Sequence, residues 1–567
     1  MRAPLAAGAA SLLAVLSLAP ALAPRRPHRA PDYDLLLVGG TVVDGTGGPR
    51  RRANVAVSGD RIAAIGDLTG RTARRTVDAT GLVVSPGFID MLGHSEATIL
   101  VDPRGLSKVT QGVTTEITGE GISVAPVNAT TLHGDSAQYA AWGLTVDWRD
   151  LDGYFRRLER SGTPLNLATF VGATQVRRYV LGDADRAPTT AELTQMEALV
   201  DTAMRQGALG VSSALVYAPA FYATTDELIA LARVAGRYGG LYATHIRNEG
   251  ARIDDALAEA FRIGREAAVP VEVWHLKLAG RASWGRMPRI LARFERLRRA
   301  GQRVGANSYP YTASATGLSS SIPAWAHAGG DDSLVRRLQD PVIRARIRRA
   351  MRGGGRQARP SRGAGGLSGV VVLGVLDPTL RRYEGRRITD IARDEHKDPY
   401  DVLFDLLVAD HAKTGAAYFS MNESDVRATV VAPWVGVGMD FGAVAPDGPL
   451  EMRVVHPRAY GTFPRILGRY VREERALTLE AAVRKMTGVA AERMGLRERG
   501  ILREGYFADI TVFDPAAVGD RASFAAPHEP SVGIRYVLVN GRFTLDDGRL
   551  TGERPGRALR GPGWRAP

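Results

Sequence analysis

The amino-acid sequence predicts an α/β protein built on an eight-fold (β/α)8 barrel of the TIM-barrel type, with a small β-sandwich formed from both chain ends. Three observations support this prediction. Strand-like and helix-like segments alternate from about residue 86 to residue 496. No glycine-rich phosphate-binding turn follows any of these strands, which disfavours a doubly wound sheet. Short β-rich runs separated by glycine-containing turns open and close the folded chain.

The composition is that of a globular protein without thiol chemistry. The chain has 567 residues, of which 45% are hydrophobic and 24% charged, enough for one large domain and a smaller one. It contains no cysteine. Disulfides, thiolate nucleophiles and cysteine zinc ligands are therefore excluded, and a metal would need His, Asp, Glu or a modified Lys.

The N-terminus has the pattern of a secretory signal peptide. Residues 1–23 contain one early arginine, an apolar run and small residues suited to cleavage, which we place after Ala21 rather than Ala23. We expect an exported protein, extracellular or periplasmic, with residues 24–32 as a linker. A signal-anchored form is the alternative. No later stretch is long and apolar enough to cross a bilayer, so stable membrane insertion of the mature chain is not expected.

The two chain ends carry the signals of a small antiparallel sheet. Residues 33–85 form short alternating runs, and residues 497–560 repeat this pattern with a hairpin signal at Asn540 and Gly541. Between them, Thr189 with Glu192 and Thr224 with Glu227 match the capping box that begins a helix. Residues 478–496 predict one amphipathic outer helix that ends at a glycine.

A basic segment accounts for most of the formal net charge of +14. Residues 333–362 hold ten arginines and one aspartate and run into glycine-rich sequence. This composition favours a solvated, partly disordered insertion, at about 314–367, over a specific nucleic-acid footprint. We therefore expect no nucleic-acid partner.

Two histidines organise the central part of the sequence. His245 and His275 each close a buried strand, and the segment between them has helical periodicity, with Ala256, Ala260 and Ile263 on one face. In a parallel barrel the C-terminal strand ends meet at one rim, so the two histidines would be neighbours there. The alternative is two unrelated histidines that hydrogen-bond locally.

Three carboxylate or imidazole side chains could complete a site at that rim. Glu120 lies between two glycines where a strand gives way to a loop, and with the two histidines it makes the ligand set of a catalytic zinc. His94 stands near the end of the first barrel strand. It is either a metal ligand or an outer or substrate-contacting group, because Leu92 occupies the position from which a second histidine could chelate the same metal. Asp440 ends a small-residue strand and is a candidate general base, provided that no cation neutralises it.

Cationic and phenolic groups near these strand ends could hold an anionic substrate, because a carboxylate suits a planar arginine with a phenol alongside. The candidates are Lys277, Tyr309, Tyr311 and Arg458.

The order of the motifs resembles the D-aminoacylase, or N-acyl-D-amino-acid deacylase, family of the amidohydrolase superfamily. The resemblance covers Tyr33 to about Arg560 and rests on GGTVVDGTG, SPGFID, QGVTTEITGEGISVAP, ATHIRNEG, WHLKLAG, YPYTASATG, HPRAYGTFPRILGRYVRE and LREGYFADITVFDP.

The resemblance implies a distorted (β/α)8 barrel and zinc-dependent amide hydrolysis. It assigns His245 and His275 to a tightly held metal, Asp440 to the general base, Lys277 to the reacting centre, and a tyrosine of the YPY motif with Arg458 to the substrate carboxylate. Two departures stand out. Leu92 replaces a usual histidine, and Glu120 a usual cysteine. We therefore expect one tight zinc.

The expected activity is hydrolysis of an N-acyl-D-amino acid or a related small acylated or peptidic substrate. A cyclic-amide or dipeptide hydrolase of the same superfamily, and a catalytically impaired binding protein, are the alternatives. The resemblance also places the region from Ser314 to Leu367 where a covering insertion occurs. We hypothesise that this region is a lid whose arginines favour acidic substrates or an anionic surface.

Overall fold

The computed structural model describes residue 1 and residues 31–133, 136–352, 366–450 and 454–566. Apart from Met1, the expected signal sequence lies outside the described residues. None of the helices in those ranges combines the length and apolar character that crossing a membrane requires.

Two parallel sheets form the centre of the molecule, in the orders β10-β9-β8 and β11-β12-β13-β14-β15-β19. Only Phe170 separates β10 from β11, and the N–H of Leu209, just before β12, donates to the Thr169 carbonyl in β10 at 2.9 Å. At the other edges, the Met91 N–H donates to the Val437 carbonyl at 3.0 Å. Backbone hydrogen bonds thus link the two sheets at both ends. The strands are β8 (Phe88–Asp90), β9 (Val113–Thr118), β10 (Asn166–Thr169), β11 (Val171–Gly172), β12 (Gly210–Ala214), β13 (Leu241–His245), β14 (Val271–Val273), β15 (Val304–Ser308) and β19 (Val435–Val437).

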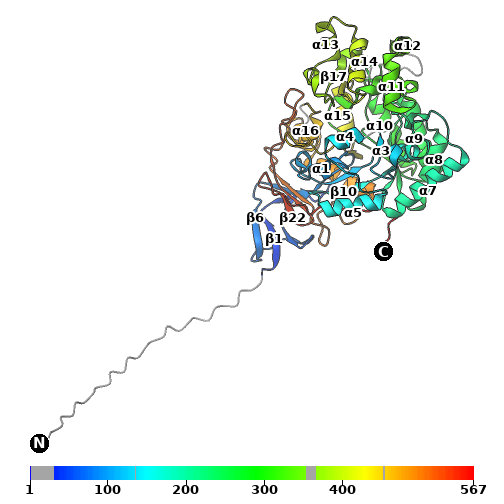
Figure 1. Cartoon of the computed structure of the whole chain (residues 1–567). Coiled ribbons are helices and arrows are strands. Elements are labelled where there is room, and N and C mark those ends of the chain that lie inside the picture. Colours follow the sequence, from blue (N-terminus) through cyan, green and yellow to red (C-terminus); the bar gives the residue numbers. More distant parts are fainter. Residues whose placement is uncertain (2–30, 134–135, 353–365, 451–453, 567) are drawn as a thin grey trace.

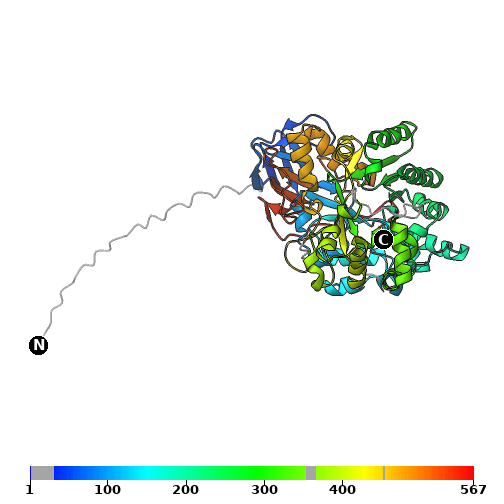
Figure 2. The same cartoon turned by 90° about the horizontal axis from the view of Figure 1, so that it is seen from above.

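Helices surround these strands (Figures 1 and 2), and their apolar faces share one large core with the strands. The helix predicted between the two histidines is confirmed, because Ala256, Ala260 and Ile263 are buried on it. The helices are α1 (Thr98–Val101), α2 (Leu106–Val109), α3 (Ala129–His133), α4 (Ser136–Ala141), α5 (Leu151–Ser161), α6 (Ala173–Leu181), α7 (Thr190–Gln206), α8 (Thr225–Arg237), α9 (Ile253–Ala267), α10 (Met287–Arg299), α15 (Glu423–Val431), α16 (Arg458–Arg465), η7 (Ile466–Glu473), α17 (Leu479–Met486) and α18 (Gly488–Met494).

The two predicted helix starts differ in how completely they are capped. At α7, Thr189 and Glu192 form the full reciprocal capping box. At α8, the Thr224 hydroxyl accepts from the Glu227 N–H at 3.2 Å, but the Glu227 carboxylate pairs with buried Arg177 at 2.6 Å. The Glu227 carboxylate therefore forms an ion pair with Arg177 instead of accepting the Thr224 backbone N–H, as the capping box would require.

The single amphipathic helix predicted at residues 478–496 is wrong, because the segment forms two helices. The backbone breaks at Thr487, between α17 and α18. Gly488 lies so close to Gly45 there that a Cβ would come within 2.4 Å of the Gly45 carbonyl oxygen. The chain ends α18 at Gly495 in the left-handed conformation, as the sequence indicated.

Strands from both chain ends pair in one seven-stranded sheet, ordered β23-β22-β21-β20-β7-β2-β3. It shares an apolar cluster with a four-stranded sheet, β5-β4-β1-β6, and the two lie side by side in Figures 1 and 2. Asn540 and Gly541 both have positive φ at the predicted hairpin between β21 and β22. The strands are β1 (Tyr33–Val38), β2 (Thr41–Val42), β3 (Arg51–Arg52), β4 (Asn54–Ser58), β5 (Arg61–Gly66), β6 (Ala73–Asp78), β7 (Val83–Pro86), β20 (Ile510–Phe513), β21 (Ile534–Val539), β22 (Arg542–Asp546) and β23 (Arg549–Leu550).

The insertion after β15 has its own core. Its three antiparallel strands are ordered β16-β18-β17, and the surrounding helices share one apolar cluster with them. In Figure 1 it forms the top of the molecule. It extends to Phe419, well past the residue 367 expected. Its elements are β16 (Ala313–Gly317), α11 (Gly330–Gln339), α12 (Pro341–Arg352), β17 (Val370–Val372), α13 (Ile388–Asp394), α14 (Pro399–Ala409) and β18 (Gly415–Phe419).

The expectation of a partly disordered arginine-rich segment is wrong for residues 333–352, which lie in α11 and α12. Leu334 and Leu338 on α11 and Ile347 on α12 are buried there, because they lie on the apolar faces of their helices, between the arginines. Arg344 pairs with Asp401 at 2.9 Å and Arg352 with Asp398 at 2.7 Å. Residues 353–365 lie outside the described residues.

Candidate metal centre and active site

The ends of β13 and β14 bring His245 and His275 together. His245 is the last residue of β13, and His275 follows β14 in a left-handed backbone conformation with φ of 38°. The centroids of their rings lie 4.3 Å apart, and both side chains are buried. The two histidines are therefore neighbours, as expected for residues that close adjacent parallel strands.

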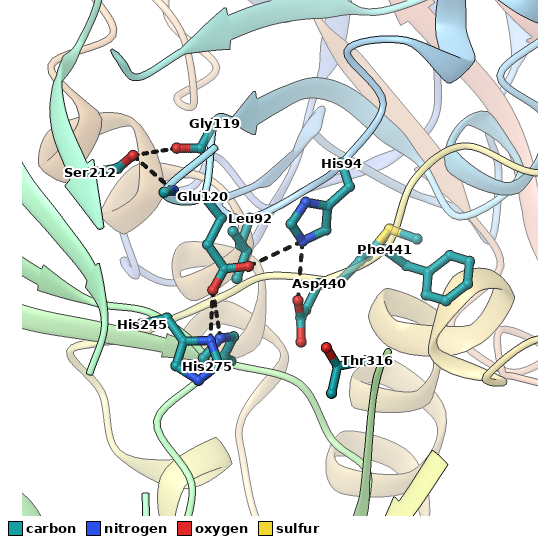
Figure 3. Close-up of polar contacts among 12 residues, drawn as sticks. Leu92, His94, Gly119, Glu120, Ser212, His245, His275, Thr316, Asp440 and Phe441 are labelled. Atoms are coloured by element: carbon teal, nitrogen blue, oxygen red, sulfur yellow. Dashed lines mark hydrogen bonds and ion pairs between the residues drawn. The ribbon is translucent and has the colours of Figure 1, made fainter. Parts of the chain in front are cut away.

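Glu120 meets both histidines from the loop after β9 (Figure 3). Its Oε1 lies 3.0 Å from His245 Nδ1 and 2.9 Å from His275 Nε2. The ligand atoms of these three residues lie within 4.8 Å of one another. Two imidazoles and one carboxylate in this arrangement fit a divalent transition metal such as zinc.

The loop that carries Glu120 is fixed by close backbone packing. Ser212 in β12 accepts a hydrogen bond from the Gly121 N–H at 3.0 Å and donates to the Gly119 carbonyl. Gly119 has φ of 94°, and a Cβ there would come within 2.7 Å of the Phe170 carbonyl oxygen. The flanking glycine is required because only it can bring the loop this close to the neighbouring strand.

A second group consists of His94, Glu120 and Asp440, whose ligand atoms also lie within 4.8 Å of one another. His94 Nε2 lies 3.3 Å from Glu120 Oε2 and 3.2 Å from Asp440 Oδ1. Leu92 is fully buried beside this group and offers no ligand atom. Glu120 thus belongs to both sets of possible metal ligands. The first set has two histidines and the second has one.

Asp440 follows β19 and is paired with a cation. Its Oδ2 lies 2.7 Å from a guanidinium nitrogen of Arg458 at the start of α16. Burial raises the pKa of Asp440, but the charges of Arg458 and His275 outweigh this and lower it to about 2. The condition set for a general base, that no cation neutralises it, is therefore not met in this arrangement.

A buried network holds the backbone on both sides of His94 and Asp440. Asp90 Oδ1 accepts from the N–H groups of Leu92 at 3.1 Å and Met439 at 2.8 Å. Lys108 in α2 donates to Asp90 Oδ2 and to the Phe441 carbonyl, both at 2.7 Å. The neighbouring strand ends are therefore tied together through side chains beneath the site.

Glu116 in β9 extends this network. It lies 3.2 Å from Lys108 and accepts from the Ser95 N–H at 3.1 Å. Burial raises the pKa of the Glu116 carboxyl to about 7, against the charge of Lys108. The residue after His94 is thus held by a carboxylate that is itself fully buried.

The four candidate substrate-binding residues do not all lie at the same place in the structure. Arg458 lines the main cavity, and its guanidinium lies 4.8 Å from the centroid of the Tyr309 ring. The Tyr309 hydroxyl is buried without a hydrogen-bond partner among the described residues. Tyr311 instead donates to the Pro457 carbonyl at 3.4 Å and contacts Arg465. Lys277 lies behind His275 and is not one of the described residues that line the cavity.

The cavity above these residues has a volume of about 820 Å³. His94, Glu120, Asp440 and Arg458 line it, together with apolar side chains and parts of the insertion. None of the described arginines at residues 333–352 lines it. The described residues therefore do not support the hypothesis that arginines of this segment line the cavity and favour acidic substrates there. The insertion residues that line the wall include Thr316, Leu376, Arg381 and Lys413.

Sequence reasoning missed two buried charged residues next to the site, Glu249 and Lys108. Glu249 lies four residues after His245, in the loop that follows β13, and its carboxylate contacts both histidines. The position of an acidic residue just beyond a strand-ending histidine was the available signal. Lys108 gave none, because its short helix has no pattern that points a side chain beneath a strand.

Comparison with known proteins identifies one family. The family model described as "Amidohydrolase family" matches residues 75–338 and 443–545. D-aminoacylase of Alcaligenes xylosoxydans xylosoxydans is 38% identical over 528 residues, 93% of this chain and 97% of that protein. N-acyl-D-aspartate deacylase of the same organism is 36% identical over 93% of this chain and 95% of that protein.

Solved structures agree with these relatives. N-acyl-D-glutamate deacylase from Bordetella bronchiseptica, complexed with zinc and a phosphonate inhibitor that mimics the tetrahedral intermediate, superposes with a TM-score of 0.77. It is 35% identical and is covered over 99% of its length by 93% of this chain. A D-aminoacylase structure gives the same TM-score at 37% identity, with 93% of this chain covering 100% of that one.

Proposed function

The chain belongs to the amidohydrolase family, and on this premise we propose that it hydrolyses the amide bond of N-acyl-D-amino acids or related small acylated or peptidic substrates. The observation that carries the proposal is the convergence of Glu120, His245 and His275 into one group of ligand atoms, next to a cavity that Glu120 and Asp440 line. Relatives that are 36–38% identical over 93% of the chain are deacylases of this kind.

We propose one tightly held zinc on Glu120, His245 and His275, with His94 and Asp440 as a weaker second group. A zinc ion in the first group supplies a Lewis acid that polarises an amide carbonyl and acidifies a water. The donor set fits because Glu120 Oε1 lies 3.0 Å from His245 Nδ1 and 2.9 Å from His275 Nε2, so a metal that replaces any proton between them would meet three ligand atoms at one point. The structure of a relative contains zinc.

Asp440 is the proposed proton carrier. It lies at the cavity wall, between His94 and Arg458. While paired with Arg458, its carboxylate is a weak base. A substrate carboxylate that binds Arg458 competes for the same guanidinium, and this releases Asp440 to take a proton and pass it to the leaving amine.

Arg458 and Tyr309 are the proposed carboxylate-binding pair. Their side chains are in contact, and the Tyr309 hydroxyl has a donor to offer because burial raises its pKa far above the usual value. A planar guanidinium and a phenol suit a carboxylate. Tyr311 is less suited, since its hydroxyl already donates to the Pro457 carbonyl. The position of Lys277 behind His275 favours a role at the histidine rather than a direct substrate contact.

We further propose that the parallel strands close into a distorted (β/α)8 barrel and that the chain ends form a β-sandwich beside it. The hydrogen bonds that link the end of β8 to β19, and β10 to the chain just before β12, support the barrel. The core shared by the two outer sheets supports the sandwich. The signal pattern at residues 1–23 supports export, with a signal-anchored form as the alternative.

Elemental analysis of purified protein, paired with a hydrolysis screen, tests the function. The proposal expects about one equivalent of zinc and turnover of N-acyl-D-amino acids in preference to their L enantiomers and to dipeptides. Protein without metal would contradict the mechanism. Metal-loaded protein that prefers N-acyl-L-amino acids would keep the chemistry and contradict the substrate class, whereas a preference for dipeptides would narrow that class to its peptidic members.

A further inference from the structure

We propose that Glu249 is a positioning residue that holds the outer nitrogens of both His245 and His275 and so aims their inner nitrogens at the metal. The inference rests on the proposed metal site. It assigns a role to a residue that the sequence did not single out. Glu249 is buried, with 8% of its surface exposed, in the loop that follows β13.

Each histidine ring lies between two carboxylates. Glu249 Oε1 lies 3.4 Å from His245 Nε2 and 3.1 Å from His275 Nδ1, which are ion-pair distances. His245 Nε2 is buried without a hydrogen-bond partner among the described residues, so Glu249 is the acceptor nearest at hand for its proton. Glu120 Oε1 approaches the opposite nitrogens, His245 Nδ1 and His275 Nε2. The two rings therefore present different nitrogen atoms inward, and Glu249 faces the remaining nitrogen of each.

This arrangement selects a tautomer. A neutral imidazole that binds a metal through one nitrogen carries its proton on the other, and an outer carboxylate that accepts this proton fixes the ring orientation. Because His245 and His275 turn different nitrogens outward, each ring needs an acceptor on its own outer side. A single oxygen of Glu249 faces both.

Lys277 offsets the free-energy cost of burying the Glu249 carboxylate. Its Nζ lies 2.6 Å from Glu249 Oε1, so the lysine neutralises a charge that would otherwise be costly beside Glu120. The same Nζ lies 2.7 Å from His275 Nδ1. An ammonium can only donate, so this contact places the His275 ring proton on the inner nitrogen, where it would block the metal; metal binding therefore requires Lys277 to direct its N–H groups to Glu249 instead. An acceptor at Glu249 favours the productive tautomer.

The test is zinc affinity, measured by competition with a chromogenic chelator. We expect Glu249→Ala to weaken zinc binding by about 10- to 100-fold, the usual cost of losing an outer partner of a metal ligand. Glu249→Gln should recover part of the loss, because its amide oxygen still accepts a hydrogen bond. Glu227→Gln is the matched control, since Glu227 is also buried and paired with a cation, Arg177. It should bind zinc like the unchanged protein.

Cobalt substitution separates a positioning role from direct ligation. The visible absorption bands of the Co²⁺ form report the ligand set, so they should keep their positions in Glu249→Ala. A spectrum altered as in His275→Ala would make Glu249 a ligand and overturn the inference. Unweakened zinc binding by Glu249→Ala would overturn it as well. Absence of zinc from the unchanged protein would remove the proposed function together with the inference, so the two failures differ.

A zinc-loaded crystal structure of the unchanged chain gives the answer even if the variants do not fold. The inference expects Glu249 within hydrogen-bond distance of both outer nitrogens and Glu120 among the ligands. A Glu249 oxygen at bonding distance from zinc, about 2.0–2.2 Å, would contradict it.

Discussion

The two groups that share Glu120 are held in different ways. His275 in the first group has 2% of its side chain exposed, and its ring is enclosed by the carboxylates of Glu120 and Glu249. His94 in the second group has 37% of its side chain exposed. In the first group, neighbouring side chains contact the ligand side chains directly. In the second group, Asp90 and Lys108 instead hold the backbone next to the ligands.

The difference suggests separate roles for the two groups: the first would bind the metal and the second would transfer the proton. Two buried imidazoles and a carboxylate favour tight binding in the first group. The second group has one imidazole, a carboxylate already paired with Arg458, and Leu92 where a further ligand could stand. The comparison therefore predicts that ligand changes in the first group remove the metal and that changes in the second alter turnover.

The largest effect is expected from His275→Ala. The variant should lose bound zinc and all measurable turnover, a larger loss than the about 10- to 100-fold expected for an outer partner. His94→Ala, its control from the second group, should keep close to one equivalent of zinc. Elemental analysis after dialysis against a weak chelator measures both. Loss of metal from His94→Ala alone would reverse the comparison.

Asp440→Asn should retain zinc and lose about 10²- to 10⁴-fold in turnover, because it removes the proton carrier without touching the first group. Steady-state kinetics on an N-acyl-D-amino acid measure the loss. Asp447→Asn changes an exposed aspartate and should leave turnover unchanged. The assignment of Asp440 would be wrong if its variant lost the metal or kept full activity.

Lys108→Met tests the buried network that holds the second group. It leaves Asp90 and Glu116 without their cation, so the free energy of unfolding should fall by about 3–5 kcal/mol. The exposed Lys397→Met should cost at most about 1 kcal/mol. Denaturant titrations compare the two. Equal stabilities would show that the network does not hold the strand ends.

The smallest expected effect concerns pH. Burial and the charge of Arg458 hold the pKa of His456 well below its usual value, so the folded chain keeps this ring neutral. The unfolded chain takes up a proton below about pH 6.5. The free energy of unfolding should therefore fall as pH drops from 6.5, by up to about 1.4 kcal/mol per pH unit, and should not change from this cause at higher pH.

His456→Gln removes this contribution, so its unfolding free energy should fall less steeply between pH 6.5 and pH 5.5. Urea titrations at these two pH values and at pH 7.5 measure the difference. Parallel pH dependence in the two proteins would show that His456 is not held neutral in the fold.

The sequence allowed prediction of the strand ends more readily than of the contacts between them. His245, His275 and Glu120 could be placed at one rim because each lies at a strand end or just after it, and parallel strands share a rim. The Arg458–Asp440 pair and the position of Lys277 behind His275 depend on side-chain directions in loops, which carry no periodic signal. Glu249 was missed although its position just beyond a strand-ending histidine was a signal. Lys108 was missed because its short helix α2 has no pattern that points a side chain beneath a strand.

The arginine-rich insertion shows a different limit. Its composition indicates a solvated segment, yet Leu334, Leu338 and Ile347 give α11 and α12 a buried face among the arginines. Aspartates from α14 and its start then pair with those arginines. The overall composition reports only the high charge of the segment. It does not report the spacing of its apolar residues, which is what predicts the helices.

The most direct test of the account is an anomalous difference map, recorded at the zinc absorption edge, from crystals grown with one equivalent of zinc. We expect one strong peak among Glu120, His245 and His275, with little or no signal between His94 and Asp440. A peak only between His94 and Asp440, or two peaks of equal height, would contradict the claim that the buried group holds the single tight metal.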